Sequence, residues 1–314
     1  MAELPLTLKQ LQYLLAISDL NHFRKAAERC GISQPSLSVQ ISNLEETLGV
    51  KLVERSRSGV ALTPIGREVA DRARRVVEDS RSIIDFTNDA KHGLSGTIRL
   101  GTKPTLGPYL LPHVVATLHK QHKDLSLYVR ENSPRELEHE LTAGVHDLIL
   151  AQYPVESTEH VSFELFREPL YLALASDHPL AEQAREKKAL PISALKGLDM
   201  LSLNPLYHLN DQVNALCQEH GAHFLRDYEG TSLDALRLMV GMGMGAAFLP
   251  ALYVHSEIKA RSEIVVARIK GRRIYRTICL AWRKSAGRAR AYRELGQVIR
   301  NVVERKFDDL TVPR

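Results

Sequence analysis

Residues 30–49 read CGISQPSLSVQISNLEETLG, and this stretch decides the fold of the N-terminal part of the chain. Its apolar residues recur at steps of four, three and four, as Leu37, Ile41, Leu44 and Leu48. That spacing predicts a helix with one buried face. Gly31 comes before the helix as a turn, and Gly49 ends it. The opposite face is polar yet nearly uncharged, whereas a solvent-exposed helix face is usually rich in Lys and Glu.

This polar face is typical of contact with DNA. Short polar side chains near a helix start suit base edges and phosphates, and the helix N-terminus adds a partial positive charge. Glutamine can pair with adenine, and proline can touch a thymine methyl group. The candidate DNA contacts on the helix are Ser33, Gln34, Pro35, Ser36, Ser38, Val39 and Gln40.

The flanking segments complete a known arrangement. Helical periods precede the stretch, and KLVERS and GVALT after it predict two short strands around a turn. Helix, glycine turn, polar helix and hairpin together predict a winged helix-turn-helix over residues 1–63. Arg24 from the preceding helix, and Arg55 and Arg57 from the hairpin, are expected to reach the DNA backbone or the minor groove. The alternative is a small helical module for dimerisation or protein binding.

A long helix is expected next, over residues 64–92. Thr63 supplies a capping hydroxyl and Pro64 stands at the first helical position. No proline or glycine interrupts residues 67–92, and apolar residues recur seven apart. We interpret this helix as a linker that pairs protomers. A long surface helix that packs within its own chain is the alternative.

In residues 93–314 the sequence pattern alternates between strand-like and helical segments. This alternation predicts an α/β effector domain with mainly parallel sheets. The fold class is therefore α/β, with a separate N-terminal DNA-binding domain. The segment GMGMGA at 241–246 follows a helix and lacks a Lys-Ser/Thr pair, so it predicts a tight turn instead of a nucleotide loop. Neither G-x-S-x-G nor a P-loop is present, and we expect no enzyme and no cofactor.

Length, net charge and cysteine count indicate the cellular compartment in which the protein is expected. The chain has 314 residues and a formal net charge of +5, of which residues 259–314 hold 16 Lys and Arg against 5 Asp and Glu. We expect this basic segment to lie on a solvated face. Three cysteines form no disulfide framework, and neither a secretory signal nor a membrane span is apparent. These features predict a cytoplasmic protein with reduced thiols and no membrane partner.

The first 66 residues resemble the N-terminus of the LysR-type transcriptional regulators, in FRKAAE, SQPSLSVQISNLE, LGVKLVER and LTPIG. The resemblance implies a two-lobed effector domain similar to the periplasmic binding proteins. Lobe I then comprises residues 96–167 and 269–314, and lobe II residues 168–268. It also implies a homodimer or homotetramer on a two-fold site in double-stranded DNA, a small-molecule effector, and RNA polymerase as a candidate partner.

GTKPTLGPYLLPHVVATLHK and TSLDALRLMVGMGMGAAFLPAL are similar to the peroxide-sensing OxyR branch of that family. The resemblance places His208 where that branch has its peroxide-reactive cysteine and Cys217 at the second cysteine. A thiol switch needs a thiolate and a partner thiol, so we do not expect the two-cysteine mechanism. Oxidation of Cys217 alone stays open, as does a metal held by Cys217, His220 and His223.

A ligand pocket between the lobes is the interpretation we favour for the polar loops. Ligands in this fold bind near strand ends and helix starts, where free N–H groups and helix dipoles suit an anion. Each hydroxyl alone is equally suited to a helix cap. The expected effector-binding residues are Thr102, Lys103, Thr105, Gln152, Tyr153, Ser202, His208, Asp211, Thr231 and Phe248. The main hypothesis is thus a LysR-type regulator with a small, anionic inducer, and no metal site is assigned. The alternative is an OxyR-like response to hydrogen peroxide through a non-standard thiol mechanism or a metal.

Overall fold

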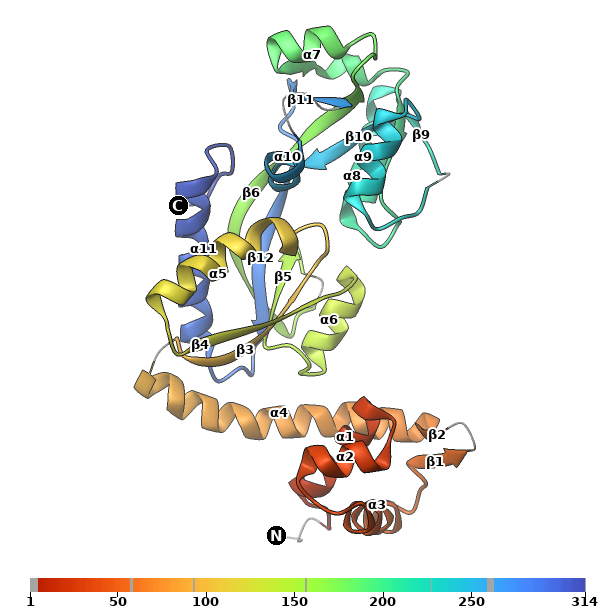
Figure 1. Ribbon diagram of the computed structural model, residues 1–314, viewed down its shortest axis with the longest axis vertical. Helices are drawn as coiled ribbons and strands as arrows, with labels where there is room; N and C mark the ends of the chain where they lie inside the picture. The colour runs from red at the N-terminus through yellow and green to blue at the C-terminus, as the bar shows by residue number, and fades with distance from the viewer. Residues whose placement is uncertain are drawn as a thin grey trace. The chain divides into compact units, whose positions relative to one another are not determined.

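A computed structural model describes residues 5–56, 59–92, 94–155, 157–226, 228–258 and 263–313. It divides into two compact units (Figure 1). Unit 1 is Met1–Lys91 with the short segments Thr142–Val145 and Ser285–Arg288, and unit 2 is the remainder of the chain. Each unit has its own hydrophobic core.

Unit 1 contains the expected helix-turn-helix, hairpin and long helix. Its elements are α1 (Leu8–Leu20), α2 (Phe23–Cys30), α3 (Gln34–Leu48), β1 (Val53–Ser56), β2 (Gly59–Leu62) and α4 (Pro64–His92). Gly31 and Gly49 end α2 and α3 in the left-handed conformation, which glycine adopts without a side-chain clash. Leu37 and Leu44 are fully buried, and Ile41 is nearly so, as the spacing predicted.

The hairpin is fixed to α3 by a buried carboxylate. Oε1 of Glu45 accepts hydrogen bonds from the backbone N–H groups of Leu52 at 2.9 Å and Val53 at 3.1 Å. Its Oε2 accepts one from Nζ of Lys51 at 2.6 Å. The chain therefore leaves α3 in a defined direction, which sets where the hairpin lies relative to that helix.

The start of α4 is fixed by Thr63 and Gly66. The Thr63 hydroxyl accepts a hydrogen bond from the Gly66 N–H and donates one to the Lys51 carbonyl, both at 2.8 Å. A Cβ atom on Gly66 would lie 2.0 Å from the Leu52 carbonyl oxygen, so only glycine fits. The helix then runs for 29 residues, and its exposed apolar residues include Val76, Ile83 and Ile84.

Unit 2 is built on one large sheet with helices on its faces (Figure 1). The strand order is β4-β3-β5-β12-β6-β10-β8-β9, and β11 pairs with both β6 and β7. The strands are β3 (Gly96–Thr102), β4 (Leu125–Glu131), β5 (Leu148–Gln152), β6 (His160–Ala175), β7 (Ala189–Pro191), β8 (Asp199–Leu201), β9 (His223–Phe224), β10 (Ala246–Pro250), β11 (Ile264–Lys270) and β12 (Tyr275–Arg283). The helices are α5 (Gly107–Gln121), α6 (Pro134–Thr142), α7 (Ala181–Lys187), the 3-10 turn η1 (Ile192–Leu195), α8 (His208–His220), α9 (Leu233–Gly241), α10 (Ala251–Glu257) and α11 (Ala289–Lys306).

The expectation of mainly parallel strands is wrong for the middle of this sheet. β3, β4 and β5 are parallel to one another, as are β8, β9 and β10. β12 is antiparallel to both β5 and β6, and β6 is antiparallel to β10 and β11. The sheet is mixed because two long strands join its parallel ends.

β6 belongs to both ends of the sheet. Its residues 160–169 pair with β12, and its residues 170–175 pair with β10 and β11. We call β3, β4, β5, β12 and residues 160–169 the first half-sheet, and β8–β11 with residues 170–175 the second half-sheet. The expected lobe boundary between residues 167 and 168 falls inside this continuous strand.

Candidate functional site

The side of α3 that is expected to contact DNA is exposed. Ser33, Gln34, Pro35, Ser36 and Val39 lie at the surface, and Ser38 and Gln40 are partly covered. The Val39 side chain keeps 56% of its surface, which is unusual for a branched apolar residue unless a partner covers it. These positions are therefore available to a large ligand such as a DNA groove.

Some of the expected DNA contacts, among them Ser33, Ser36 and Arg24, also have partners within the protein. The Ser33 hydroxyl caps α3 by accepting the Ser36 N–H at 3.2 Å, and it lies 2.7 Å from the Ser36 hydroxyl. Arg24 forms an exposed ion pair with Glu28 at 3.1 Å. The backbone of Arg55 lies in β1, but its side chain and all of Arg57 fall outside the described residues.

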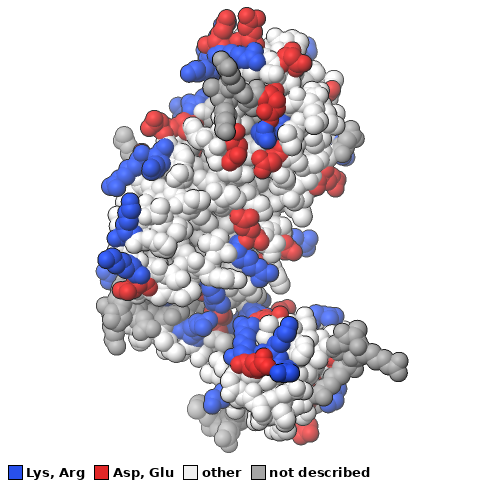
Figure 2. Space-filling model, in the orientation of Figure 1, with Lys and Arg blue, Asp and Glu red and all other residues white. Residues whose placement is uncertain are grey.

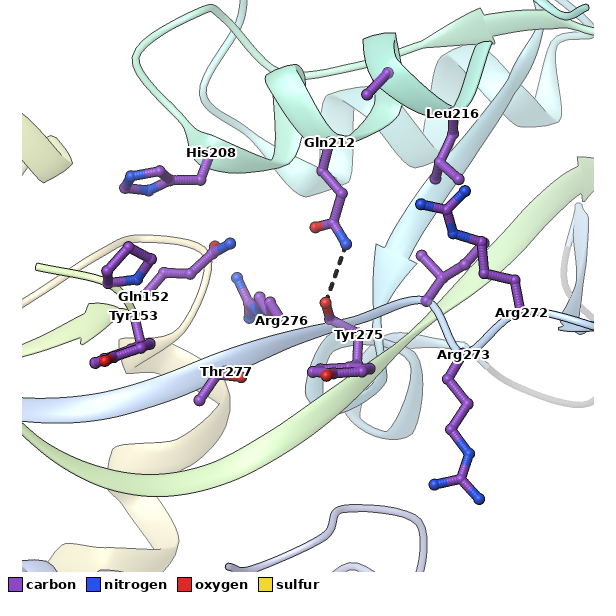
Figure 3. Close-up of a pocket in the computed structure, with 13 residues that line it drawn as sticks. Gln152, Tyr153, His208, Gln212, Leu216, Arg272, Arg273, Tyr275, Arg276 and Thr277 are labelled. Carbon is purple, nitrogen blue, oxygen red and sulfur yellow. Dashed lines mark hydrogen bonds between the residues drawn. The ribbon is translucent and has the colours of Figure 1, made fainter. Parts of the chain in front are cut away.

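A pocket of about 460 Å³ opens in unit 2 between α8, the end of β5 and the start of β12. Gln152, Tyr153 and His208 line it, as the sequence predicted (Figure 3). The structure adds residues that the sequence did not indicate, namely Gln212, Arg272, Arg273, Tyr275, Arg276 and Thr277. The segment RRIYR was predicted only as part of a basic solvated face. Pairing of β12 with β5 and β6 brings it to the pocket.

The floor of the pocket is held by fixed polar contacts. Nε2 of Gln212 donates a hydrogen bond to the Tyr275 carbonyl at 3.0 Å, which joins α8 to β12 (Figure 3). Arg276 is buried, and its Nε donates to Oε2 of Glu168 at 2.7 Å. Arg272 forms an ion pair with Glu219 on α8. Of the three arginines in the described lining, Arg276 pairs with Glu168 and Arg272 pairs with Glu219, so Arg273 is the arginine whose charge suits an anion.

Four other expected effector residues are buried and do not line this pocket. Thr102, Lys103, Thr105 and Ser202 are each at most 3% exposed. The Thr105 hydroxyl accepts a hydrogen bond from Nη1 of Arg276 at 3.3 Å, and the Thr105 carbonyl accepts one from Nη2 at 2.9 Å. Burial, with Arg276 as a second cause, lowers the pKa of Lys103 to about 7. Within the described part of the chain, Oγ1 of Thr102 and Oγ of Ser202 have no hydrogen-bond partner.

The remaining three expected effector residues lie elsewhere. Phe248 was expected at the end of a strand, but it sits in the middle of β10 and is 1% exposed in the core of the second half-sheet. Pairing with β6 and β8 makes β10 an interior strand of the sheet, and all of its residues are buried. Thr231 is exposed before α9, and Asp211 is exposed in the first turn of α8. None of the three lines the pocket.

The cysteine in α8 is a core residue. Cys217 is 3% exposed, and burial raises the pKa of its thiol to about 11. Cys279 on β12 is fully buried, and burial raises its pKa to about 12. High pKa values keep both thiols protonated and poorly nucleophilic near neutral pH.

The metal alternative receives no support from the positions of Cys217, His220 and His223. Gly221 ends α8, and His223 lies in β9, where its Nδ1 is 3.1 Å from Oδ1 of Asp199. Over the residues that the structure describes, no group of three His, Cys, Asp or Glu side chains is placed to hold a metal ion.

Two family models match the chain along nearly its whole length. The helix-turn-helix model of bacterial regulators of the lysR family matches residues 8–67, and the LysR substrate binding domain matches residues 91–304. Together with the exposed polar helix and the pocketed mixed sheet, these matches define a class. The chain belongs to the LysR family of transcriptional regulators, whose members are regulators and not enzymes.

Within that family the chain falls in the OxyR branch. It is 35% identical over 303 residues to the DNA-binding transcriptional dual regulator OxyR of Escherichia coli K12, covering 96% of this chain and 98% of the relative. It is 33% identical over 306 residues to the hydrogen peroxide-inducible genes activator of Pectobacterium carotovorum, covering 98% of this chain and all of the relative.

Solved structures agree with the sequence relatives. A full-length OxyR variant from Pseudomonas aeruginosa has a TM-score of 0.80 and 34% identity, with 95% of this chain and 96% of that chain covered. A hydrogen peroxide-bound OxyR mutant from Corynebacterium glutamicum has a TM-score of 0.66 and 28% identity, with 97% of this chain and 94% of that chain covered.

Within the described part of the protein, no helix is long and apolar enough to cross a membrane.

Proposed function

We propose that this protein is a transcriptional regulator of the peroxide response that senses its signal in the pocket beside His208, without a disulfide pair. The observation that carries the proposal is 35% identity, over 96% of the chain, to the E. coli regulator OxyR. The named relatives favour this peroxide response, which the sequence suggested as the alternative, over an unspecified inducer.

The chemistry of this chain argues against the usual thiol route. A cysteine attacks peroxide as its thiolate and then needs a second thiol to trap the sulfenic acid. With a pKa near 11, Cys217 is thiolate in only about one molecule in ten thousand at pH 7. His208, the first residue of α8, is not a thiol and cannot trap a sulfenic acid. We therefore assign the signal to reversible occupancy of the pocket.

DNA is the output partner in this proposal. The exposed face of α3 enters a major groove, and α4 pairs two protomers so that two such helices read a two-fold promoter site. The Val76, Ile83 and Ile84 side chains that α4 exposes are suited to that pairing. A dimer or a tetramer would meet this requirement, and RNA polymerase would be contacted at the bound promoter. A pocket ligand shifts DNA affinity only if it prefers one arrangement of the DNA-binding heads.

A DNase footprint on the upstream region of the protein's own gene tests this function. The full-length protein is footprinted with and without hydrogen peroxide under non-reducing conditions, beside Cys217→Ser and His208→Ala. We expect peroxide to change the length or strength of the footprint for the wild type and for Cys217→Ser, but not for His208→Ala. Loss of the response in Cys217→Ser would refute sensing without the thiol. A footprint that ignores peroxide in all three proteins would refute the peroxide function.

A small-anion inducer is the second candidate, and Arg273 in the pocket lining favours it, because no carboxylate of the described residues pairs with that guanidinium. In that case the footprint forms but ignores peroxide. A set of small mono- and dicarboxylates is then added to the footprint reaction. We expect one of them to alter the footprint of the wild type and to leave that of His208→Ala unchanged.

A further inference from the structure

A second pocket, of about 690 Å³, lies in unit 2 apart from His208. It is lined by residues of four segments: β6, β11, the turn between β11 and β12, and the C-terminal tail. These are Arg167, Pro169, Leu170, Arg268, Ile269, Arg272, Arg273, Ile274, Tyr275, Asp309 and Thr311. Only the turn, residues 272–275, also lines the first pocket. In Figure 3, Arg273 points away from His208 and Gln212, whereas Arg272 points towards Leu216.

The tail wall of this second pocket is ordered by backbone pairing. The Arg167 N–H donates to the Thr311 carbonyl at 2.8 Å, and the Thr311 N–H donates to the Arg167 carbonyl at 3.0 Å. Asp309 anchors the same tail. Its Oδ2 accepts a hydrogen bond from the Tyr171 hydroxyl at 2.6 Å, and its Oδ1 lies 2.8 Å from Nε2 of His255. The cavity is therefore a built feature of the fold, with walls from segments far apart in sequence.

The charges of the second pocket do not balance. Among the described residues, Asp309 is the only carboxylate in the lining, and it is already bound to Tyr171, to His255 and to Arg268 at 3.3 Å. Arg272 is paired with Glu219 on α8. In the described part of the chain, no carboxylate lies within ion-pair distance of Arg167 or Arg273. Two guanidinium groups thus remain available, and Figure 2 shows Lys and Arg gathered along the edge of unit 2 where the C-terminus lies.

The floor of the second pocket is apolar. Leu170 and Ile274 are buried beneath it, and the Tyr275 ring is partly exposed. The guanidinium carbon of Arg167 lies 5.3 Å from the centre of that ring, a distance at which the ring helps to hold the cation in place. A cavity with two free arginines over an apolar floor recognises both the charge and the carbon skeleton of a ligand.

We propose that this pocket binds a small organic polyanion with at least two phosphate or carboxylate charges. Arg167 and Arg273 would bind the anionic groups, because a guanidinium offers paired N–H donors that match phosphate and carboxylate oxygens. Arg167 and the C-terminal tail line this pocket and not the one beside His208, and the proposal does not depend on the peroxide proposal. Residues 272–275 line both pockets, so we expect a ligand bound in one pocket to change the affinity of the other for its ligand.

Calorimetric titration of the full-length protein with pyrophosphate and with citrate tests the proposal. We expect at least one of them to bind the wild type, and the double variant Arg167→Gln/Arg273→Gln to bind it about tenfold more weakly or not at all. Binding of pyrophosphate alone would identify a phosphate ligand, and binding of citrate alone a carboxylate ligand. Both results would support the site.

The matched control is Arg135→Gln/Arg293→Gln, which removes the same charge from exposed positions on α6 and α11 outside both pockets. Polyanions also bind DNA-reading surfaces, and that background is the same in both double variants. Equal loss in the control, or no loss in Arg167→Gln/Arg273→Gln, would overturn the proposal, as would a wild type that binds neither probe. His208→Ala should keep polyanion binding, which separates this test from that of the proposed function.

Discussion

Glu168 and Arg276 form a buried ion pair in which Oε2 of the carboxylate accepts a hydrogen bond from Nε of the guanidinium at 2.7 Å. Their side chains are 0% and 2% exposed. Oε1 of Glu168 also accepts the Leu252 N–H at 2.8 Å, and Arg276 donates to the Thr105 carbonyl at 2.9 Å. One pair therefore joins β6, β12, the start of α10 and the loop before α5. These are the segments where the two half-sheets meet.

We expect Glu168→Gln to destabilise unit 2 by about 3–5 kcal/mol, because it leaves the Arg276 charge buried without a counter-ion. Urea unfolding followed by circular dichroism measures the change in the free energy of unfolding. The control is Asp199→Asn, which removes the exposed contact to His223 in the same unit. That control should change stability by about 0.5 kcal/mol or less. Equal effects of the two variants would show that the buried pair is not a structural anchor.

Cys217 is expected to resist oxidation in the folded protein. Burial raises its pKa to about 11, so the thiolate that reacts with peroxide is scarce at pH 7. Mass spectrometry after a short exposure to hydrogen peroxide should find Cys217 and Cys279 unmodified, and the half-buried Cys30 should react first. In protein unfolded in urea, all three thiols should react at similar rates. Rapid sulfenic acid formation at Cys217 in the folded state would contradict the expectation.

The stability of unit 1 is expected to depend on Glu45 and on pH. Burial raises the pKa of this carboxyl, but hydrogen bonds from Lys51 and from the Leu52 and Val53 N–H groups outweigh burial and hold it below its ordinary value of 4.5. A lowered folded pKa means that the stabilisation is complete above the unfolded pKa and is lost as the pH falls through the folded pKa.

Glu45→Gln should therefore cost about 1–3 kcal/mol at pH 7, because it weakens hydrogen bonds to a buried charged group. The difference from the wild type should shrink as the pH falls below 4.5, because the carboxyl is then progressively protonated. Urea unfolding of both proteins across this range, monitored as loss of helical signal, tests the prediction. The exposed neighbour Glu46→Gln is the control, and it should show no such convergence.

Ser38→Ala should weaken DNA binding and leave the oligomer intact. Ser38 lies on the outer side of α3, one turn after the capped start, and next to the exposed Val39. Loss of one hydroxyl contact with DNA corresponds to about 1 kcal/mol, or roughly fivefold in affinity. Gel-shift titration measures the affinity, and size-exclusion chromatography checks the oligomer. Thr47→Ala, exposed in the last turn of the same helix, should bind DNA normally.

Local sequence signals were sufficient for unit 1. The steps of four, three and four in α3, the Thr63 cap and the two turn glycines each act within a few residues. The structure contains these helices and this hairpin. In unit 2 the same signals gave most strands and helices, but they did not give the pairing of β6 and β12. These strands are more than 100 residues apart, and no local period encodes which strands become neighbours.

The residues of the candidate pocket also fall into those that the sequence predicted and those that it did not. Sequence placed Gln152, Tyr153 and His208 at strand and helix ends, where polar groups meet a cavity. It did not indicate Arg272, Arg273 or Arg276, because a run of basic residues is usually a solvent-exposed surface. Only the pairing of β12 with β5 and β6 brings these arginines to the pocket. The same limit applies to Phe248, whose burial depends on both neighbours of β10.

Short-range sequence signals specified the helix-turn-helix, the long helix after it and the α/β class, since each depends on residue type or on short spacing. The mixed order of the sheet, the buried Glu168–Arg276 pair and the two arginine-lined pockets became visible only in the folded chain. The physical reason is that burial and charge pairing are properties of side chains brought together from distant segments. Their energies therefore exist only once the chain has folded.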